Sequence, residues 1–376
     1  MQAKDVLQSL AEKADIRING NRPWDVQVHN ENLYRRVLGQ GTLGLGEAYM
    51  DGWWDCERMD VMIEKALNAR VDGRISGNLP TLLHVAAQKL FNLQSVARAG
   101  IVAERHYNAE RAMFETMLDP YMQYSCAYWR ALPDQAAAPA DLAAAQINKM
   151  ELICRKLKLE EGQSVLDIGC GWGGLARYMA EHYGVRVTGV TVSDEQLSYA
   201  QEHAAGLPVD FKLMDYRSLD GKYDRVVSVG MFEHVGRKNY AAFMDVVRRC
   251  LKPEGLFLLH TLGSDGGGSG ADPWLTKYIF PNGILPSTTS LMRAAQGRFI
   301  MEDWQNFGAF YDPTLLVWHK NFEKGCLEGK FRCDERMRRM YEYYLLSCAG
   351  ASRARGFQLW QVVFSPHGVP GGYERP

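Results

Sequence analysis

Four short apolar runs alternate with helical segments in the second half of the chain: SVLDIGC from Ser164, VRVTGVT from Val185, YDRVVSVGMF from Tyr223 and GLFLLHTL from Gly255. Their apolar positions are nearly continuous, which is typical of strands buried on both faces of a parallel sheet. The run FQLWQVVFS at 357–365 alternates instead and predicts a late antiparallel strand. The pattern therefore predicts an α/β fold with a doubly wound, mostly parallel sheet.

The beginning of the chain shows a different pattern. DIRINGN from Asp15 and DVQVHN from Asp25 alternate like short strands, and the glycine- and aromatic-rich segment 41–56 shows no helical period. Farther along, apolar residues recur on one face of a predicted helix between Leu83 and Leu93. We expect a smaller N-terminal α/β domain over 1–75, a helical linker over 76–100 and the larger sheet domain over 101–376.

Composition places the chain among ordinary globular proteins, because 47% of its residues are hydrophobic and 23% are charged. The net charge of −1 provides no basic field for nucleic acid, so no such partner is expected. The eight cysteines stand singly and the N-terminal segment has no secretory pattern, which favours a cytoplasmic protein. No apolar run reaches the roughly 18 residues of a membrane span, so any membrane contact is expected to be peripheral.

The segment VLDIGCGWGG, residues 165–174, is the strongest candidate for a ligand site. A strand that ends in Asp167 runs into a turn with Gly169, Gly171 and Gly173, and a helix follows. Glycines let the backbone approach a ligand where a Cβ would clash. Because Gly169, Gly171 and Gly174 also satisfy G-x-G-x-x-G, a dinucleotide remains an alternative, as does a tight turn that binds nothing.

Motifs farther along decide between these ligands by resemblance. GCGWGG, GVTVSDEQ, MDYRSL and SVGMFEHVG follow one another in an order that resembles the class I S-adenosylmethionine-dependent methyltransferases. With MQYSCAYW, LHTLG, DPWLTKYIFPNG, NFGAFYDPTL and LWQVVFS, the chain resembles the cyclopropane-fatty-acyl-phospholipid synthases, and GTLGLGEAYMDGWWD extends the resemblance toward the N-terminus. The resemblance implies methyl transfer from S-adenosylmethionine to the cis double bond of unsaturated phospholipid acyl chains, followed by closure of a cyclopropane ring.

The resemblance also implies which residues bind the cofactor. Thr191 and Gln196 are expected near the ribose and methionine parts, and Tyr216 and Arg217 beside the adenine. The full set is Tyr124, Ser125, Asp167, Gly169, Gly171, Gly173, Thr191, Gln196, Tyr216 and Arg217. One segment departs from the family pattern His-Tyr-Asp-x-x-Asn, because Asn108 and Arg111 stand at the usual Asp and Asn. Local details of the helix that covers the cofactor are therefore expected to differ.

Such a reaction needs no metal, because the methyl group of a sulfonium is already a strong electrophile. Its addition to a π bond leaves a carbocation-like centre, which aromatic faces can stabilise and from which a base must remove a proton. The resemblance implies a bicarbonate ion as that base, held by Cys126, Glu233, His260 and Tyr311. Taken singly, Cys126 and Tyr311 also fit core positions and His260 a satisfied histidine, whereas Glu233 follows a strand where α/β folds bind ligands.

Two segments are expected to contact the bilayer. The stretch Thr81–Arg98 is basic and amphipathic, and Trp274–Phe280 gathers aromatic residues around one lysine. The domain at 1–75 carries no cofactor or acid–base signature, so we expect it to serve lipid access. The resemblance further implies a homodimer at the inner face of the cell membrane.

Two other classes of function stay open at this stage. The same cofactor could yield a methyl-branched or methylene acyl chain, a methylated sphingolipid or mycolate, or a methylated amine. The Cys–Glu–His–Tyr set argues against the amine, since N-methylation needs no such base. A lipid-binding protein with an inactive cofactor site is the alternative without catalysis, and the intact DIGCGWGG and FEHVG motifs argue against it.

Overall fold

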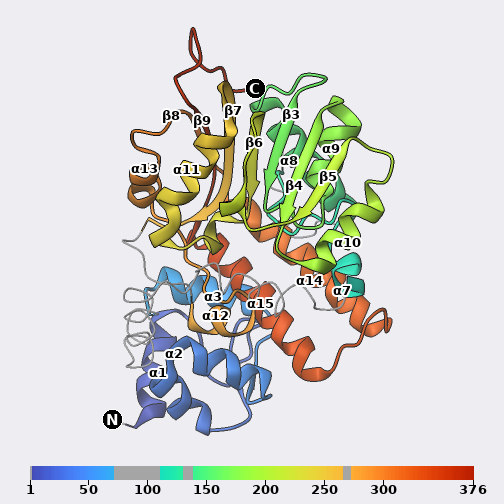
Figure 1. Cartoon of the computed structure of the whole chain (residues 1–376). Helices are drawn as coiled ribbons and strands as arrows, with labels where there is room; N and C mark the ends of the chain where they lie inside the picture. Colours follow the sequence, from blue (N-terminus) through green and yellow to red (C-terminus); the bar gives the residue numbers. More distant parts are fainter. Residues whose placement is uncertain (1, 72–110, 130–138, 266–271) are drawn as a thin grey trace. The chain divides into compact units, whose positions relative to one another are not determined.

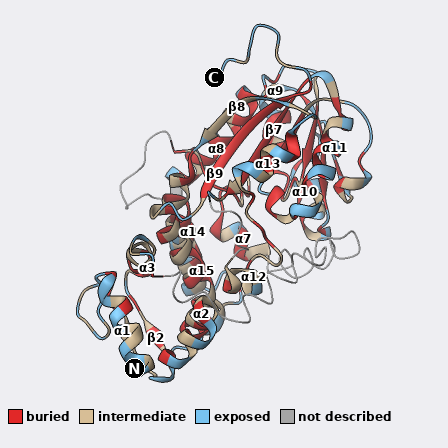
Figure 2. Cartoon of the chain, turned by 90° about the vertical axis from the view of Figure 1, so that its left-hand side faces the viewer, coloured by how far each residue is buried: buried red, intermediate tan, exposed pale blue. Residues whose placement is uncertain are grey.

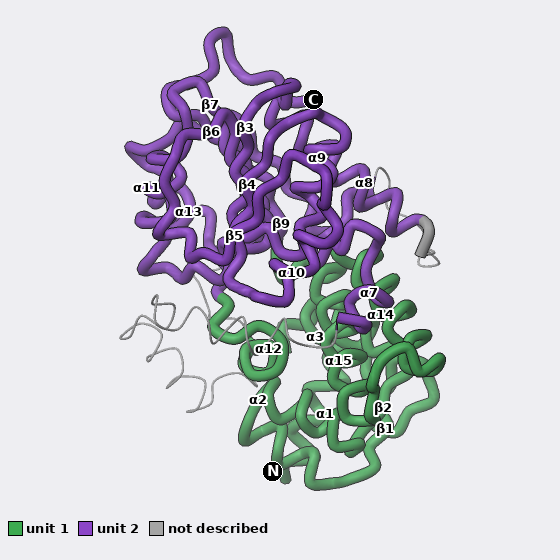
Figure 3. Tube along the Cα trace, turned by 45° about the vertical axis from the view of Figure 1, so that its right-hand side comes forward, with its two compact units in different colours: residues 1–92, 269–283, 311–357 green, residues 93–268, 284–310, 358–376 purple. Residues whose placement is uncertain are grey.

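The computed structural model describes residues 2–71, 111–129, 139–265 and 272–376. The chain forms two compact units (Figure 3). Unit 1 combines residues 1–92, 269–283 and 311–357, and unit 2 combines residues 93–268, 284–310 and 358–376. The predicted N-terminal domain thus belongs to a unit that also contains two later segments of the chain. The predicted linker at 76–100 lies outside the described residues.

A seven-stranded sheet forms the centre of unit 2, in the order β5-β4-β3-β6-β7-β9-β8. The strands β5, β4, β3, β6 and β7 are parallel, whereas β9 pairs antiparallel with both β7 and β8. Every residue of β9 is buried (Figure 2). Their bounds are β3 Ser164–Ile168, β4 Arg186–Thr191, β5 Val209–Leu213, β6 Tyr223–Val229, β7 Leu251–Gly263, β8 Ile300–Asn306 and β9 Gln358–Ser365. The mostly parallel sheet and its late antiparallel strand confirm the prediction.

Helices cover both faces of this sheet (Figure 1). Successive side chains of a strand point to opposite faces, so Leu166 packs in one core with Phe243 and Leu291, while Val165 packs in the other with Met150. The helices are α7 Arg111–Met117, α8 Pro139–Lys156, α9 Gly174–Tyr183, α10 Asp194–His203, α11 Tyr240–Cys250 and α13 Thr288–Ala295. Short 3₁₀ turns are η1 Tyr216–Ser218, η2 Phe232–His234, η3 Arg237–Asn239 and η4 Gly308–Phe310.

Unit 1 is largely helical. Its elements are α1 Ala3–Lys13, β1 Gln27–Val28, α2 Asn32–Met50, β2 Trp54–Asp55, α3 Met59–Asn68, α12 Pro273–Tyr278, α14 Tyr311–Leu327 and α15 Glu335–Arg353. The first predicted N-terminal strand is reduced to an isolated bridge between Ile18 and Val26, and the second to the two residues of β1, which pairs with β2 and not with the first.

The glycine-rich segment at 41–56, which shows no helical period, lies mostly within α2. The backbone breaks at Gly41, with φ of 62° and ψ of −139°, and then continues as helix. A Cβ on Gly46 would lie 2.5 Å from the indole of Trp274. The prediction of an irregular segment was wrong because Gly46 permits close helix packing there rather than a turn.

The aromatic segment 274–280 is not the exposed surface predicted for membrane contact. Trp274 is 0% and Ile279 5% exposed, and the Trp274 ring lies 4.6 Å from that of Tyr343. The segment forms α12 and packs inside unit 1, so this prediction was wrong for Trp274 and Ile279. The other predicted membrane segment, Thr81–Arg98, lies outside the described residues. Within the described parts of the chain, no helix has both the length and the apolarity needed to cross a bilayer.

Two of the cysteines that stand singly in the sequence are joined in the structure. Cys326 and Cys333 form a disulfide at the end of α14. Six residues lie between them, a spacing that gives no motif in the sequence. The remaining six cysteines are free thiols, and all but Cys348 are buried.

Candidate active site

A glycine turn joins β3 to α9 at the carboxyl end of the strand. Gly169, Gly171 and Gly173 have φ angles of 82°, 53° and 80°, a region that favours glycine. A Cβ on Gly169 would lie 2.6 Å from Met231 and one on Gly173 2.7 Å from Ala200, whereas one on Gly171 would meet nothing within 4 Å. The turn therefore leaves open backbone at Gly171, where the cofactor is predicted.

Asp167 contributes a buried carboxylate immediately before this turn. The residue is 2% exposed, and its Oδ2 has no hydrogen-bond partner among the described residues. Burial raises the pKa of Asp167 to about 7. A cationic group placed beside it would stabilise its charge and supply the missing partner. The amino group of S-adenosylmethionine is such a cation, so Asp167 and Gly171 fit the predicted cofactor.

The next strand of the sheet ends in a second polar pair. Thr191, the last residue of β4, donates its hydroxyl to Gln196 Oε1 at 2.9 Å, and both residues are buried. The side chain of Ser193 caps α10 by accepting the backbone N–H of Gln196 at 3.3 Å. The structure thus brings Thr191 and Gln196 into contact at the carboxyl edge of the sheet, where ligands bind in such folds.

The segment 122–129 is held by the helix α8. Gln146 donates its amide to the carbonyl of Ser125 at 2.9 Å, and Lys149 donates to the Ser125 hydroxyl at 2.6 Å. The ring of Tyr124 lies 5.1 Å from Phe114 in an edge-to-face contact. Cys126, the next predicted site residue, is 0% exposed. Two side chains one helical turn apart therefore fix the backbone on which Tyr124, Ser125 and Cys126 lie.

Lys149 is a residue that the sequence analysis missed. It is 0% exposed, and burial lowers its pKa to about 8, although the charge of Asp119 opposes the shift. A signal was available in the sequence, because Gln146 and Lys149 stand at helical spacing among apolar residues of α8 such as Leu142 and Ile153. A charged side chain is seldom buried so completely unless other groups compensate it.

Glu233 lies in η2, beyond the carboxyl end of β6. Its Oε1 accepts the backbone N–H of Leu262 at 2.6 Å, while Oε2 is buried without a hydrogen-bond partner among the described residues. Burial raises the pKa of Glu233 to about 7, although the N–H of Leu262 opposes the shift. The carboxyl group is therefore poised between its two protonation states near neutral pH.

His260 lies on β7 opposite Val229, the last residue of β6. Its Nδ1 lies 3.3 Å from Nε2 of Gln361 on β9, and its own Nε2 is buried without a hydrogen-bond partner among the described residues. Burial lowers the pKa of His260 well below its usual value, and the charges of Lys149 and Lys156 lower it further. The ring is thus neutral. Since the Gln361 amide donates to Nδ1, the ring proton lies on Nε2, a donor in search of an acceptor.

Aromatic rings border His260. Phe307 lies 5.7 Å from the imidazole, and the ring of Tyr128 lies 5.3 Å from Phe307 and 5.4 Å from Phe310. The faces of such rings carry partial negative charge and attract cations. These rings therefore form an aromatic wall beside His260.

Three other predicted site residues have their described contacts elsewhere. Tyr311 begins α14 in unit 1, where its ring lies 5.8 Å from Phe357. Tyr216 is 7% exposed and packs against Phe243, and Arg217 forms a two-pronged ion pair with Asp215. These contacts also suit structural roles, and the cofactor roles of all three residues stay predictions.

The departure from the family pattern at Arg111 has a structural counterpart. Arg111 binds Glu115 on its own helix at 2.8 Å and Glu202 of α10 at 3.0 Å. Its guanidinium also lies 4.6 Å from the centre of the Tyr199 ring. This arginine therefore links α7 to α10, the helix that carries Gln196. Asn108 lies outside the described residues.

Known proteins share both the sequence and the fold. Residues 94–362 match the family model described as mycolic acid cyclopropane synthetase. The chain is 51% identical over 367 residues to the cyclopropane-fatty-acyl-phospholipid synthase of Escherichia coli strain K12, which covers 98% of this chain and 94% of that protein. The resemblance stated from the motifs is thereby confirmed.

Solved structures agree with this match. The cyclopropane synthase MmaA2 from Mycobacterium tuberculosis superimposes with a TM-score of 0.64 at 28% identity, covering 70% of this chain and 97% of that one. The mycolic acid cyclopropane synthase CmaA1, complexed with SAH and CTAB, gives a TM-score of 0.62 at 30% identity with the same coverage. The predicted fold of the class I methyltransferases is confirmed.

Proposed function

This chain belongs to the mycolic acid cyclopropane synthetase family, and on that premise we propose that it methylates phospholipid acyl chains. The donor is S-adenosylmethionine and the acceptor is the cis double bond of an unsaturated chain in a membrane phospholipid. The product is a cyclopropane ring. Its near-full-length relative in Escherichia coli is a cyclopropane-fatty-acyl-phospholipid synthase, which supports the phospholipid as substrate.

The reaction makes specific demands on the protein. The bond between sulfur and methyl breaks, a carbon–carbon bond forms to the olefin, and a proton leaves the added methyl as the ring closes. The chain must hold the two reactants in line and exclude water from the cationic centre. The aromatic wall of Tyr128, Phe307 and Phe310 suits this task, because its rings can stabilise a cation without attacking it.

The observation that carries the assignment of the base is the pair of unpartnered buried atoms on Glu233 and His260. The Nε2–H of His260 requires an acceptor, and a Glu233 carboxyl that is protonated in part near pH 7 can donate or accept. A bicarbonate ion offers both a hydroxyl that donates and oxygens that accept hydrogen bonds. When bound, it would supply a weakly nucleophilic base that removes the proton without trapping the cation. We assign Cys126, Glu233, His260 and Tyr311 as its binding residues.

Lys149 supplies a positive charge that can offset the repulsion between the bound anion and Glu233. An anion beside a buried carboxylate is repelled unless a proton or a positive charge compensates it. The ammonium group of Lys149 is buried on the Ser125 hydroxyl, next in sequence to Cys126, and its charge acts on both Cys126 and His260. We assign it the role of holding segment 124–126 and balancing the charge of the anion.

The proposed reaction is tested with labelled S-adenosylmethionine and vesicles of unsaturated phospholipid, followed by mass analysis of the acyl chains. A gain of one CH₂ with loss of the olefin is the expected result. Vesicles of saturated phospholipid serve as the control and should remain unlabelled. A gain of CH₂ with the olefin retained would instead indicate a methyl-branched or methylene product.

The assigned base has a separate test. Turnover should fall in carbonate-depleted buffer and return when bicarbonate is added, while binding of S-adenosylmethionine measured by calorimetry stays unchanged. If depletion leaves the rate of the wild-type protein untouched, the base is a group of the protein itself.

Access to acyl chains requires the protein to meet the bilayer, so we propose a peripheral association with the inner face of the cell membrane and a homodimeric assembly. Co-sedimentation with anionic phospholipid vesicles tests the first, and light scattering of the purified protein the second. The N-terminal segment 1–75, which lies in unit 1, is proposed to serve lipid access. Truncation is unsuited to test this, because residues 1–92 form one compact unit with residues 269–283 and 311–357.

A further inference from the structure

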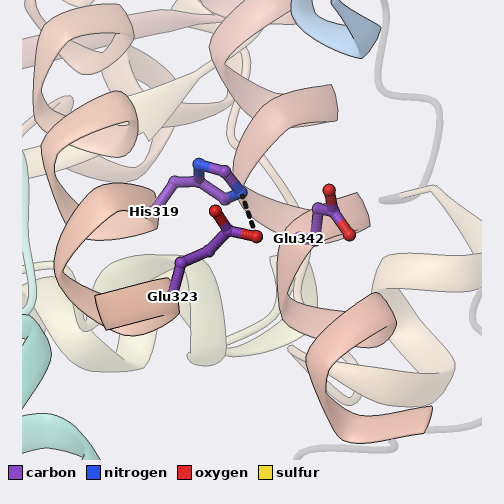
Figure 4. A group of neighbouring side chains, drawn as sticks. All are labelled: His319, Glu323 and Glu342. Atoms are coloured by element: carbon purple, nitrogen blue, oxygen red, sulfur yellow. Dashed lines mark ion pairs between the residues drawn. The ribbon is translucent and has the colours of Figure 1, made fainter. Parts of the chain in front are cut away.

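We propose that His319, Glu323 and Glu342 form a binding site for one divalent transition-metal cation, best suited to Zn²⁺, between α14 and α15 of unit 1. Each of the three side chains offers one ligand atom, and these atoms all lie within 4.8 Å of one another. Figure 4 shows the imidazole of His319 facing the carboxylate of Glu323, with Glu342 beside them on the neighbouring helix. None of these residues takes part in the proposed methyl transfer.

The helix geometry brings the donors together. His319 and Glu323 are four residues apart on α14, which puts them on the same face of that helix, and Glu342 approaches from α15. His319 Nε2 lies 3.8 Å from Glu323 Oε1, which is too long for a hydrogen bond. Two ligands of one tetrahedral zinc ion lie about 3.4 Å apart, given bond lengths near 2.1 Å. Small side-chain rotations are therefore enough to close the site.

The imidazole already has the form that binds a metal. Nε2 of His319 is buried and has no hydrogen-bond partner among the described residues, although the side chain as a whole is 15% exposed. One imidazole nitrogen beside two carboxylates is a set of donors that zinc accepts, and a buried nitrogen without a partner is otherwise unfavourable.

A second side chain orients one of the carboxylates. Tyr49 of α2 is 3% exposed and hydrogen-bonds to Glu342. Burial and the charge of Glu342 both raise the pKa of Tyr49, so its hydroxyl keeps the proton and donates it. Carboxylates that ligate metals are usually fixed in this way by an outer hydrogen bond.

Arg338 is the competitor of the proposed ion. Its Nη1 lies 3.1 Å from Glu342 Oε2 and 3.4 Å from Glu323 Oε1. Its other nitrogens, Nε and Nη2, each bind Glu335 at 2.9 Å. An incoming cation needs to displace only Nη1, since the guanidinium stays attached to Glu335. The two carboxylates would then exchange one shared positive charge for a doubly charged ion.

The competition gives the proposal a signature that a simple salt-bridge cluster lacks. Removing Arg338 should weaken the helix pair if the cluster is only structural, but it should tighten cation binding if the site is real. Removing His319 should have the opposite effect on the cation, because it deletes the one nitrogen ligand. The bound ion would stabilise the folded protein by RT ln(1 + c/Kd), where c is the free zinc concentration, so the gain grows with the logarithm of c once the site is filled.

The test uses the full chain, freed of metal with a chelator that is then removed. Zn²⁺ binding is measured by calorimetry, and Co²⁺ is added as a spectroscopic probe of ligand type. We expect one equivalent to bind, with affinity at least tenfold weaker in His319→Gln and about tenfold weaker in Tyr49→Phe. Arg338→Gln should bind at least threefold more tightly, and the surface variant His367→Gln should match the wild-type protein.

Three results would overturn the proposal. The first is the absence of saturable zinc binding at 100-fold excess over micromolar protein. The second is equal affinity of the wild-type protein and His319→Gln. The third is a strong near-ultraviolet charge-transfer band with Co²⁺, since this band marks thiolate ligands and would assign the ion to cysteines.

Discussion

Unit 1 and the candidate site of unit 2 both bury charged side chains, but they differ in whether these side chains have partners. In unit 1, Asp60 is 2% exposed and accepts hydrogen bonds from Arg58 and Arg353. Burial alone would raise the pKa of Asp60, yet the two arginines overcome this effect and lower it. Arg353 also binds Asp312, so both carboxylates have a positively charged partner.

In unit 2, the buried groups of the candidate site lack such partners. Asp167, Glu233 and His260 each keep a buried atom without a hydrogen bond among the described residues, and burial shifts each pKa toward the neutral form. An unpaired buried polar group costs free energy that folding alone does not recover. The comparison therefore indicates that paired charges stabilise unit 1, whereas the unpaired buried groups of the candidate site in unit 2 are suited to bind ligands. Among the described residues of unit 1, His319 is a titratable side chain that shares the second pattern.

The largest effect is expected for Arg353→Met in unit 1. The substitution leaves Asp60 and Asp312 without their shared partner, and removing one side of a buried ion pair typically destabilises a protein by about 3 kcal/mol or more. Chemical denaturation at pH 7 measures the free energy of unfolding.

The exposed pair of Lys4 with Glu31 provides the control, because its side chains are 48% and 78% exposed. Lys4→Met should leave the free energy of unfolding nearly unchanged, because solvent screens this exposed pair. Equal effects of the two substitutions would contradict the view that the Arg353 network stabilises unit 1.

Glu233→Gln should come next and should act on catalysis instead. The amide cannot exchange a proton with the bound base, so turnover on unsaturated vesicles should fall by at least about 10²-fold. Affinity for S-adenosylmethionine should change little, because Glu233 lies outside the predicted cofactor residues. Steady-state rates and calorimetric binding measure the two effects.

The same variant has a characteristic pH dependence. The folded pKa of Glu233 is about 7, above the usual value of 4.5, so the stability this group contributes is present below pH 4.5 and is lost as pH rises through 7. Replacing the carboxyl of Glu233 with the amide of Gln removes this loss of stability. The variant should therefore gain stability relative to the wild-type protein between pH 5 and pH 8, and a parallel pH profile for the two proteins would contradict the raised pKa.

Lys149→Met should have an intermediate effect. The apolar side chain is similar in length but removes the positive charge beside the anion site, so the apparent affinity for bicarbonate should fall about tenfold, or ~1.4 kcal/mol. The pKa of His260 should rise, since the Lys149 charge helps to lower it.

A purely structural role of Lys149 would lower stability and leave the bicarbonate dependence of the rate unchanged. The bicarbonate titration of the rate and the pH–rate profile distinguish the two roles. Restoration of the rate by excess bicarbonate is the expected outcome.

Cys126→Ser should have the smallest effect. The residue is 0% exposed and its thiol contacts the carbonyl of Ala127 at 3.4 Å, a contact that a hydroxyl can replace. We expect a loss of turnover below about threefold, or ~0.7 kcal/mol. A loss as large as that of Glu233→Gln would mean that the thiol has a chemical role that a hydroxyl cannot take over.

Much of unit 2 could be predicted from local sequence. The apolar runs at Ser164, Val185, Tyr223 and Gly255 correspond to parallel strands, because strands buried on both faces have few polar positions. The glycine turn was equally readable, since Gly169 and Gly173 adopt positive φ angles and crowd their neighbours. Unit 1 was harder. Its glycines in α2 serve helix packing, and the aromatic residues of α12 are buried by α2 and α15 rather than by lipid.

The sequence by itself determined four parallel strands and the last antiparallel strand of the sheet, the glycine turn and the types of residue that can perform the chemistry, because these depend on local periodicity and backbone freedom. The tertiary structure decided which polar atoms have partners. Gln361 of β9 directs the proton of His260 to Nε2 from 101 residues away, and Lys149 reaches Ser125 across 24 residues. Local sequence carries no record of such pairings, since they arise only when distant strands and helices pack together and exclude water.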